Sequence, residues 1–293
     1  MEALLSLAFD KISSKDSTKI KTGLRQIEGL LAQICLSSAQ QSTQSPSKHR
    51  RSASVINTSA KEDSRPKTLQ DLPDDPAFRE FFRLQDGFEW NVASRLITTL
   101  ERLLGFTQTS SADLLILSTL TLLHGTLLLH PPSRALFTRE IYMNLLLDLL
   151  DSANPPAIQS TTLLVLVTAL LGTPQNTRVF ERIDGLLTIT SAFKSRSTTR
   201  GLKGKLLEFL YFYLMPEVGL GLGSEPNTVV RAKRSRSLLS ITSGVGEEEE
   251  EEDDDEAQKE IRSTDEKQKL LGKYLSNVED LVQDLRESTP FGV

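Results

Sequence analysis

The sequence is poor in the residues on which disulfides, metal sites and much of catalysis depend. Its 293 residues include one cysteine, one tryptophan and three histidines. The single cysteine, Cys35, cannot form an internal disulfide, which favours a reducing compartment. No aspartate or glutamate lies at regular helical spacing from His49, His124 or His130, so we expect no metal site.

Motifs that carry catalysis are also missing. The chain has no GxxxxGK[ST] loop for phosphate, and Gly219, Gly221 and Gly223 alternate without a strand before them or a helix after them. A cysteine phosphatase needs arginine six residues after its cysteine, where this chain has Gln41. We therefore expect a protein that is not an enzyme and that uses no cofactor.

The sequence gives little support for insertion into a membrane or for binding to nucleic acid. The N-terminus lacks a basic secretory leader, and the longest apolar stretch, Leu114 to Leu129, has 16 residues where a membrane span needs about 20. The basic residues between Arg196 and Lys205 have no aromatic neighbours that could stack on bases, and the isoelectric point is about 5.4. We expect a cytoplasmic or nuclear protein without membrane insertion or nucleic-acid binding.

Charge and polar residues are strongly segregated. The net charge of -5 contains an acidic run, Glu247 to Glu256, of -10, which leaves the rest of the chain at about +5. Such a run is typical of a solvated linker, although it could bind a basic partner or screen the basic residues from Arg231 to Arg236. Segments 37–75 and 217–256 are rich in Ser, Thr, Pro, Gly and charge, and we expect both to be disordered because they cannot bury enough apolar surface.

An internal repeat dominates the segment between these two regions. With a shift of 43 residues, Leu120, Leu123 and Leu127 align with Leu163, Leu166 and Leu170, and Phe137 aligns with Phe180. Phe82 and Gly87 have the same spacing as Phe180 and Gly185, which suggests a degenerate third copy. Leucine-rich helical units with a period in the forties predict a short armadillo/HEAT-like helical repeat stack, hence an all-α core over 76–216.

Amphipathic helices are predicted on both sides of this core. Residues 1–36 read as a helical hairpin that packs on the core. Residues 257–287 read as one amphipathic C-terminal helix, which either returns to the core or binds another chain. The last core helix carries Tyr211, Phe212 and Tyr213 on more than one face, so it is either buried on several sides or exposes an aromatic docking patch.

Several segments together resemble a known family. They are Met1–Leu5, Arg83–Val92, His130–Pro131, Ser133–Arg134 with Phe137, and Leu206–Glu217. These residues are similar to those of the fungal cell division control protein 14 family of the septation initiation network, which is distinct from the phosphatase of the same name. The resemblance covers about 1–36 and 76–217.

Membership would imply a non-catalytic regulatory or scaffold subunit. Proteins of this kind bind a STE20-like, germinal-centre protein kinase at the spindle pole body and promote septum formation and cytokinesis. The alternative is an armadillo-type adaptor or cargo-binding protein outside kinase signalling, which would use repeated Trp and Asn in a groove. The single tryptophan argues against this alternative.

The resemblance assigns no contact residues, so the candidates follow from position. Large aromatic side chains dominate interface energies, which favours Phe88, Trp90 and the aromatic helix Tyr211–Tyr213 as partner contacts. Trp90 could equally be a core residue at a helix start. Ser54 follows His49 and Arg51, Ser237 follows Arg234, and both serines are candidates for phosphorylation by basophilic kinases.

Overall fold

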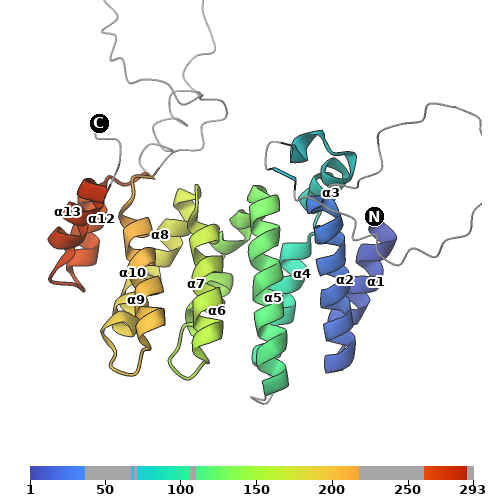
Figure 1. Cartoon of the computed structure of the whole chain (residues 1–293), viewed down its shortest axis with the longest axis horizontal. Helices are drawn as coiled ribbons and strands as arrows, with labels where there is room; N and C mark the ends of the chain where they lie inside the picture. Colours follow the sequence, from blue (N-terminus) through green and yellow to red (C-terminus); the bar gives the residue numbers. More distant parts are fainter. Residues whose placement is uncertain (37–66, 69–70, 106–109, 218–260, 289–293) are drawn as a thin grey trace, which may run out of the picture. The chain divides into compact units, whose positions relative to one another are not determined.

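The computed structural model describes residues 1–36, 67–68, 71–105, 110–217 and 261–288 (Figure 1). All the secondary-structure elements in these ranges are helices, apart from a single bridge residue, so the predicted all-α class is confirmed. Ser54, Ser237 and the acidic run lie outside the described residues. The chain forms two compact units, Met1–Ser133 and Arg134–Val293, so the predicted core at 76–216 is divided between them.

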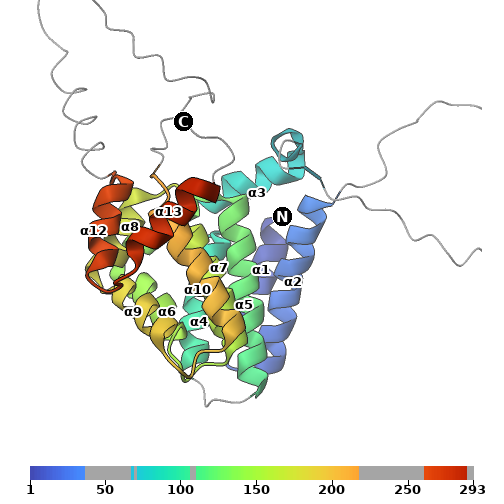
Figure 2. The same ribbon diagram turned by 60° about the vertical axis from the view of Figure 1, so that its left-hand side comes forward.

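The described residues of unit 1 form five α-helices and a short 3-10 helix before Pro131. They are α1 (Glu2–Ile12), α2 (Ser17–Cys35), η1 (Leu72–Asp74), α3 (Pro76–Asp86), α4 (Val92–Leu104) and α5 (Ser110–Leu129). Helix α2 packs against α1 on one side and α5 on the other, and α5 also packs against α4, as Figures 1 and 2 both show. The unit boundary falls within the next 3-10 helix, η2 (Pro131–Thr138).

The helical pair α1–α2 is held by a close backbone approach. The carboxylate of Asp16 caps α2 by accepting a hydrogen bond from the Thr18 amide at 2.9 Å. Further along α2, a methyl group on Gly23 would lie 2.7 Å from Ile12 Cγ2 and 2.9 Å from the Ala8 carbonyl oxygen. Only glycine leaves room for α1 to pack this close.

Replacing Gly23 with alanine is expected to destabilise the protein by about 1–3 kcal/mol, because the new methyl group overpacks the α1–α2 contact. Urea unfolding followed by circular dichroism measures the change. Gly29→Ala in the same helix is the control, since a methyl group there meets nothing within 4 Å and should stabilise by up to about 1 kcal/mol. Equal effects of the two substitutions would contradict the packing argument.

Helix α5 is longer than the apolar stretch identified in the sequence. It starts at Ser110 rather than near Leu114, and its Ser111–Leu129 portion is long and apolar enough to cross a membrane by length and composition. Half of that portion is buried inside the protein, and α5 packs against α2 and α4. This is the environment of a core helix, and the absence of membrane insertion stays a prediction.

The end of the segment expected to be disordered is ordered. Residues 71–75 include η1, in which Leu72 is buried, and the Lys67 amide donates to the Cys35 carbonyl oxygen at 2.8 Å. The Lys67 ammonium also pairs with the carboxylate of Asp75, which caps α3. The prediction for 37–75 was wrong over these residues because composition averages hide one buried leucine and one ion pair.

The described residues of unit 2 form seven α-helices. They are α6 (Glu140–Leu149), α7 (Pro156–Leu170), α8 (Pro174–Arg182), α9 (Gly185–Lys194), α10 (Arg200–Leu214), α12 (Thr264–Gly272) and α13 (Val278–Ser288). Helix α7 packs against α6, α8 and α10, and α10 packs against α9, α12 and α13 (Figure 2).

The order of elements follows the 43-residue period. Under this shift, α5, η2 and α6 correspond in sequence to α7, α8 and α9. Within unit 2, the Asn176 side chain donates to the Arg134 carbonyl oxygen at 2.8 Å, and Arg182 Nε lies 2.9 Å from a Glu140 carboxylate oxygen. Both contacts connect an element of the first copy of the repeat with one of the second, and the armadillo or HEAT type stays a prediction.

The proposed third copy was inferred because Phe82 and Gly87 have the same spacing as Phe180 and Gly185. The two glycines, however, have different surroundings. A methyl group on Gly185 would lie 2.3 Å from the Phe180 ring, so glycine is required there. A methyl group on Gly87 would meet only the Leu84 carbonyl oxygen at 3.6 Å. The shared spacing is therefore not a shared packing contact.

The predicted C-terminal helix is two helices. Helix α12 begins at a capping box formed by Ser263 and Glu266, and it ends at Gly272, with five residues between it and Val278, the start of α13. The break lets Leu271, Leu275, Val278 and Leu281 all be buried while α12 and α13 both contact α10. Of the two alternatives left open by the sequence, the segment returns to its own chain.

Candidate functional site

The loop between α3 and α4 presents the most exposed aromatic side chain of the described residues. Phe88 is 79% exposed, while the neighbouring Asn91 and Val92 are buried. Asn91 caps α4, since its Oδ1 accepts from the Ser94 amide at 2.8 Å. The loop thus leaves one large apolar group in water between two well-anchored helices.

Buried amides hold this loop in shape. The Gln85 side chain is 1% exposed; its Nε2 donates to the Trp90 carbonyl oxygen at 3.1 Å and its Oε1 accepts from the Val92 amide at 2.7 Å. Asn91 Nδ2 donates to the Gln85 carbonyl oxygen at 2.7 Å. Buried hydrogen bonds of this kind fix a single backbone conformation, because breaking any of them would leave an unpaired polar group.

The same network continues into His130. Asn91 Nδ2 also donates to Ser133 Oγ at 2.9 Å, Ser133 Oγ lies 2.8 Å from His130 Nδ1, and His130 Nε2 lies 3.0 Å from Asp86 Oδ1. These contacts form one chain of donors if His130 is neutral with its proton on Nε2: Asn91 donates to Ser133, Ser133 to His130, and His130 to Asp86. A second ring proton would deprive the Ser133 hydroxyl of its acceptor.

Burial lowers the pKa of His130 below its ordinary value of 6.5, although Asp86 opposes this change. Because the folded state prefers the neutral ring, the stabilisation is present above pH 6.5 and is lost as pH falls through the lowered folded-state pKa. An NMR titration of the His130 ring protons should give a midpoint below 6.5, and Asp86→Asn should lower it further. A midpoint above 6.5 would contradict the neutral network.

An arginine lies among the aromatic rings of this loop and α1. We call Phe9, Phe88, Trp90 and Arg95 the aromatic stack. The Arg95 guanidinium lies 5.5 Å from the Phe9 ring centre and 5.9 Å from that of Phe88, and the Phe9 and Trp90 rings stack at 6.4 Å. Trp90 is partly buried and Phe9 is 7% exposed, so Phe88 is the member of the stack that a partner would meet first.

The other aromatic candidates lie at the end of α10. The Tyr211 hydroxyl donates to Asp284 of α13 at 3.2 Å, and Phe212 is partly buried with its ring 6.2 Å from that of Phe209. Tyr213 is 2% exposed, and its hydroxyl donates to Glu181 at 2.7 Å. Burial, with Glu181 beside it, raises the pKa of Tyr213, so the phenol stays protonated.

Around Tyr213 lies a group of five ionisable residues that we call the charged cluster: Arg178, Glu181, Glu217, Arg262 and Lys267. Glu217 pairs with Arg178 and with Lys267 Nζ at 3.1 Å, and it accepts from the Arg262 amide at 3.0 Å. Arg262 also pairs with Glu181. Glu217 is the last described residue before residues 218–260, and Arg262 is the second described residue after them, so the cluster joins the two described segments on either side.

Glu217→Gln is expected to destabilise the docking of α12 by about 3–5 kcal/mol, because it leaves the buried Lys267 and the half-buried Arg178 without their shared carboxylate. Hydrogen exchange read by mass spectrometry should show faster exchange in α12 than in the wild-type chain. Glu140→Gln is the control, since its ion pair with Arg182 is exposed and contributes no more than about 1 kcal/mol. Unchanged exchange in α12 would show that apolar contacts alone hold the helix.

Beside the charged cluster is an apolar cavity of about 370 Å³. Its walls come from the α7–α8 connection and the end of α10, and they include Leu171, Pro174, Phe212 and Met215. Lys267 closes one side and donates to the Met215 carbonyl oxygen at 2.9 Å. Phe212 therefore faces a cavity rather than forming a flat exposed strip.

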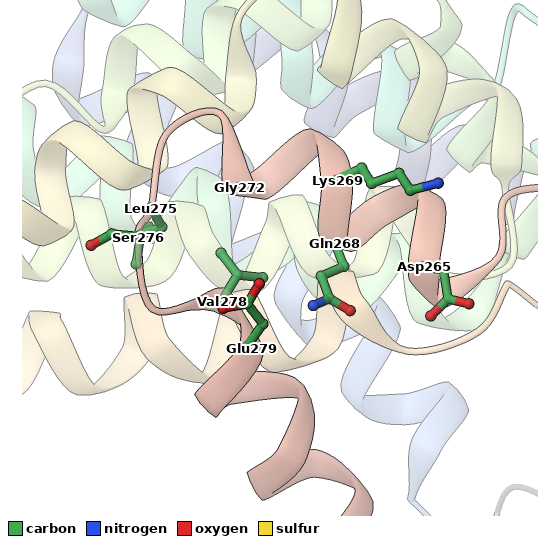
Figure 3. Close-up of a pocket in the computed structure, with 8 residues that line it drawn as sticks. All are labelled: Asp265, Gln268, Lys269, Gly272, Leu275, Ser276, Val278 and Glu279. Atoms are coloured by element: carbon green, nitrogen blue, oxygen red, sulfur yellow. The ribbon is translucent and has the colours of Figure 1, made fainter.

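A second cavity of about 510 Å³ lies along the C-terminal helices (Figure 3). Figure 3 shows its lining residues on α12, the following loop and the start of α13, among them Asp265, Lys269 and Glu279. These charged side chains are exposed and of mixed sign. No buried polar side chain lines this cavity, so nothing in its lining could select a ligand.

Ser133, His130 and Asp86 come nearest to a catalytic arrangement among the described residues. Ser133 is 4% exposed and its hydroxyl already accepts from Asn91, so no substrate can reach it. Partial burial raises the pKa of the Cys35 thiol, which Lys67 opposes, and so reduces the reactive thiolate. Neither group is prepared for nucleophilic chemistry.

Sequence reasoning missed the polar partners of these sites. Gln85, Asn91, His130 and Ser133 lie within segments that carry the family resemblance, but their spacing gave no sign of one network. The pairs Glu217–Arg262 and Glu217–Lys267 cross a gap of more than 40 residues and leave no local pattern. Ser54 and Ser237 stay predictions.

Comparison with known proteins connects the chain to cell division. A model of the family described as cell division control protein 14, SIN component, matches residues 1–291. The chain is 27% identical over 301 residues to cell division control protein 14 of Schizosaccharomyces pombe, covering 100% of this chain and 97% of that protein. No solved structure matches. The family resemblance read from the sequence is confirmed.

Proposed function

The chain belongs to the family of cell division control protein 14, the SIN component, and on this basis we propose that it is a non-catalytic regulatory or scaffold subunit of the septation initiation network. Its proposed partner is a STE20-like, germinal-centre protein kinase. In this role it acts at the spindle pole body and promotes septum formation and cytokinesis.

The main observation in favour of a binding role is the exposure of Phe88. Phe88 is 79% exposed, large aromatic side chains are enriched among the residues that dominate interface energies, and the loop that holds it is fixed by buried hydrogen bonds from Gln85 and Asn91. A side chain held in place before binding loses little conformational entropy on association. We propose that Phe88 is the main kinase contact and that Trp90 supports it from the aromatic stack.

The α10 candidates have weaker support. Tyr211 and Phe212 are half-buried against α13 and the apolar cavity, so we propose them as secondary contacts. Tyr213 is buried, and we propose that it contributes through its hydrogen bond to Glu181 rather than by touching a partner. No observation favours an adaptor or cargo carrier.

Co-expression of the full chain with the STE20-like kinase of the same organism, followed by affinity purification, tests this proposal. The wild-type chain should retain the kinase, and Phe88→Ser should weaken binding about tenfold or more, since truncating an aromatic anchor costs about 2 kcal/mol or more. Thermal melting should be unchanged.

Leu7→Ser is the matched control, because Leu7 is also a large exposed side chain of unit 1, at 47%, and belongs to neither proposed contact surface. If no kinase is retained by the wild-type chain, the functional proposal fails. If Phe88→Ser and Leu7→Ser retain the kinase as well as the wild type does, the assigned site is wrong while the function stands.

A further inference from the structure

Helix α5 keeps one exposed face without a single charge. Leu114, Ser118, Thr121, Gly125 and Leu128 recur at intervals of three and four residues and form one stripe, which we call the α5 stripe. Leu114 is 64% exposed and Leu128 is 46% exposed. A solvated helix face normally carries charged residues, so a stripe of this kind is typical of a covered surface.

The polar atoms of the stripe are already satisfied by the helix itself. The Ser118 hydroxyl donates to the Leu114 carbonyl oxygen at 2.9 Å, and the Thr121 hydroxyl donates to the Leu117 carbonyl oxygen at 2.9 Å. His124 beside the stripe adds little charge at neutral pH, because burial lowers its pKa. The face therefore behaves as a mainly apolar surface with small residues at its centre and a leucine at each end.

A groove lies between α5 and α2, beside the middle of this stripe. It has a volume of about 250 Å³, its floor includes Leu24, Leu115 and Leu122, and Ser118 and Thr121 line the α5 side. Both helices belong to unit 1 and pack against each other. From Leu114 to Leu128 the stripe is about 21 Å long at 1.5 Å per residue, which matches about four turns of a partner helix.

The α2 side of the groove supplies charge. Lys21, Arg25 and Glu28 line it and are exposed, so the two cations outnumber the one carboxylate. Among the described residues, neither Lys21 nor Arg25 lies within 4 Å of a carboxylate. A ligand whose acidic residues lie over Lys21 and Arg25 would complement this edge.

We propose that the α2–α5 groove binds an amphipathic helix of a partner protein, with apolar residues on the α5 stripe and acidic residues facing Lys21 and Arg25. Helix-in-groove recognition uses apolar side chains at intervals of three and four residues, the spacing of the stripe itself. The small Ser118, Thr121 and Gly125 allow a close approach of the two helices. The acidic run of this chain, Glu247 to Glu256, contains no apolar residue and cannot fill the stripe.

This site is separate from the aromatic stack and does not depend on the identity of the kinase partner. Loss of kinase binding in Phe88→Ser and loss of helix binding in a groove variant are independent results. Each proposal can therefore fail while the other stands.

A synthetic peptide pair tests the groove on the full chain. The probe is a fluorescein-labelled 16-residue helical peptide with leucines at intervals of three and four residues and glutamates beside them, and its counterpart carries lysines in place of the glutamates. Fluorescence anisotropy should show the glutamate peptide binding at least tenfold more tightly than the lysine peptide. Salt should weaken this preference, because exposed charges are screened.

Reversing the charge of Lys21 and Arg25 tests whether the α2 side of the groove determines which peptide binds. The double variant Lys21→Glu, Arg25→Glu should reverse the preference, so that the lysine peptide binds more tightly. The matched control is Arg79→Glu, Arg83→Glu on α3, an exposed pair with the same spacing of four residues, which should leave the preference unchanged. Equal effects of the two double variants would overturn the proposal.

A single change on the stripe tests the apolar contact. Thr121→Glu should weaken the glutamate peptide at least tenfold, whereas Thr98→Glu on α4 should not. The two threonines are matched, since both are exposed and both donate to a carbonyl oxygen four residues earlier. Circular dichroism melting confirms that the variants are folded.

Three further results would overturn the proposal. They are no binding of the glutamate peptide at millimolar concentration, equal binding of the two peptides, and full binding by Thr121→Glu. Sedimentation with vesicles containing phosphatidylserine covers another possible ligand: if the chain binds these vesicles and not the peptide, the groove is a membrane contact and the partner-helix assignment is wrong.

Discussion

The central helices α5 and α7 are apolar around almost their whole circumference, and each depends on neighbouring helices to cover it. An isolated helix of this composition would expose most of its leucines to water, at a cost of about 25 cal/mol per Å² of apolar surface. Helix α5 is covered by α2 and α4, and α7 by α6, α8 and α10. The α5 stripe is the part of α5 that no helix of unit 1 covers, so its apolar surface stays exposed to water.

Polar groups in such an environment are paired locally or over long distances. Thr119, Thr126 and Thr162 are buried, and each donates its hydroxyl proton to the carbonyl oxygen four residues earlier, so an apolar helix can contain them at little cost. Gln85, Asn91 and the charged cluster have no such local solution. Their partners come from other segments, and they join those segments because unpaired buried polar groups are costly.

The segment Arg83–Val92 shows how a family motif divides into two roles. Gln85 and Asn91 are buried and hold the loop, whereas Phe88 points into water. Sequence comparison alone would treat these residues as equal parts of one motif. Burial separates the residues that shape the loop from the residue that is free to contact a partner.

Periodicity and composition were sufficient for the all-α class and the leucine-rich core helices, because these depend on spacing within one segment. The family came from the resemblance of particular segments, such as Arg83–Val92, to a known family. The tertiary structure decided the division into two units, the break between α12 and α13, and the order around Leu72. It also decided the pairing of Glu217 with Arg262 and Lys267, and the exposure of the α5 stripe. Each of these depends on which distant segment lies against a given side chain, and local spacing carries no record of that neighbour.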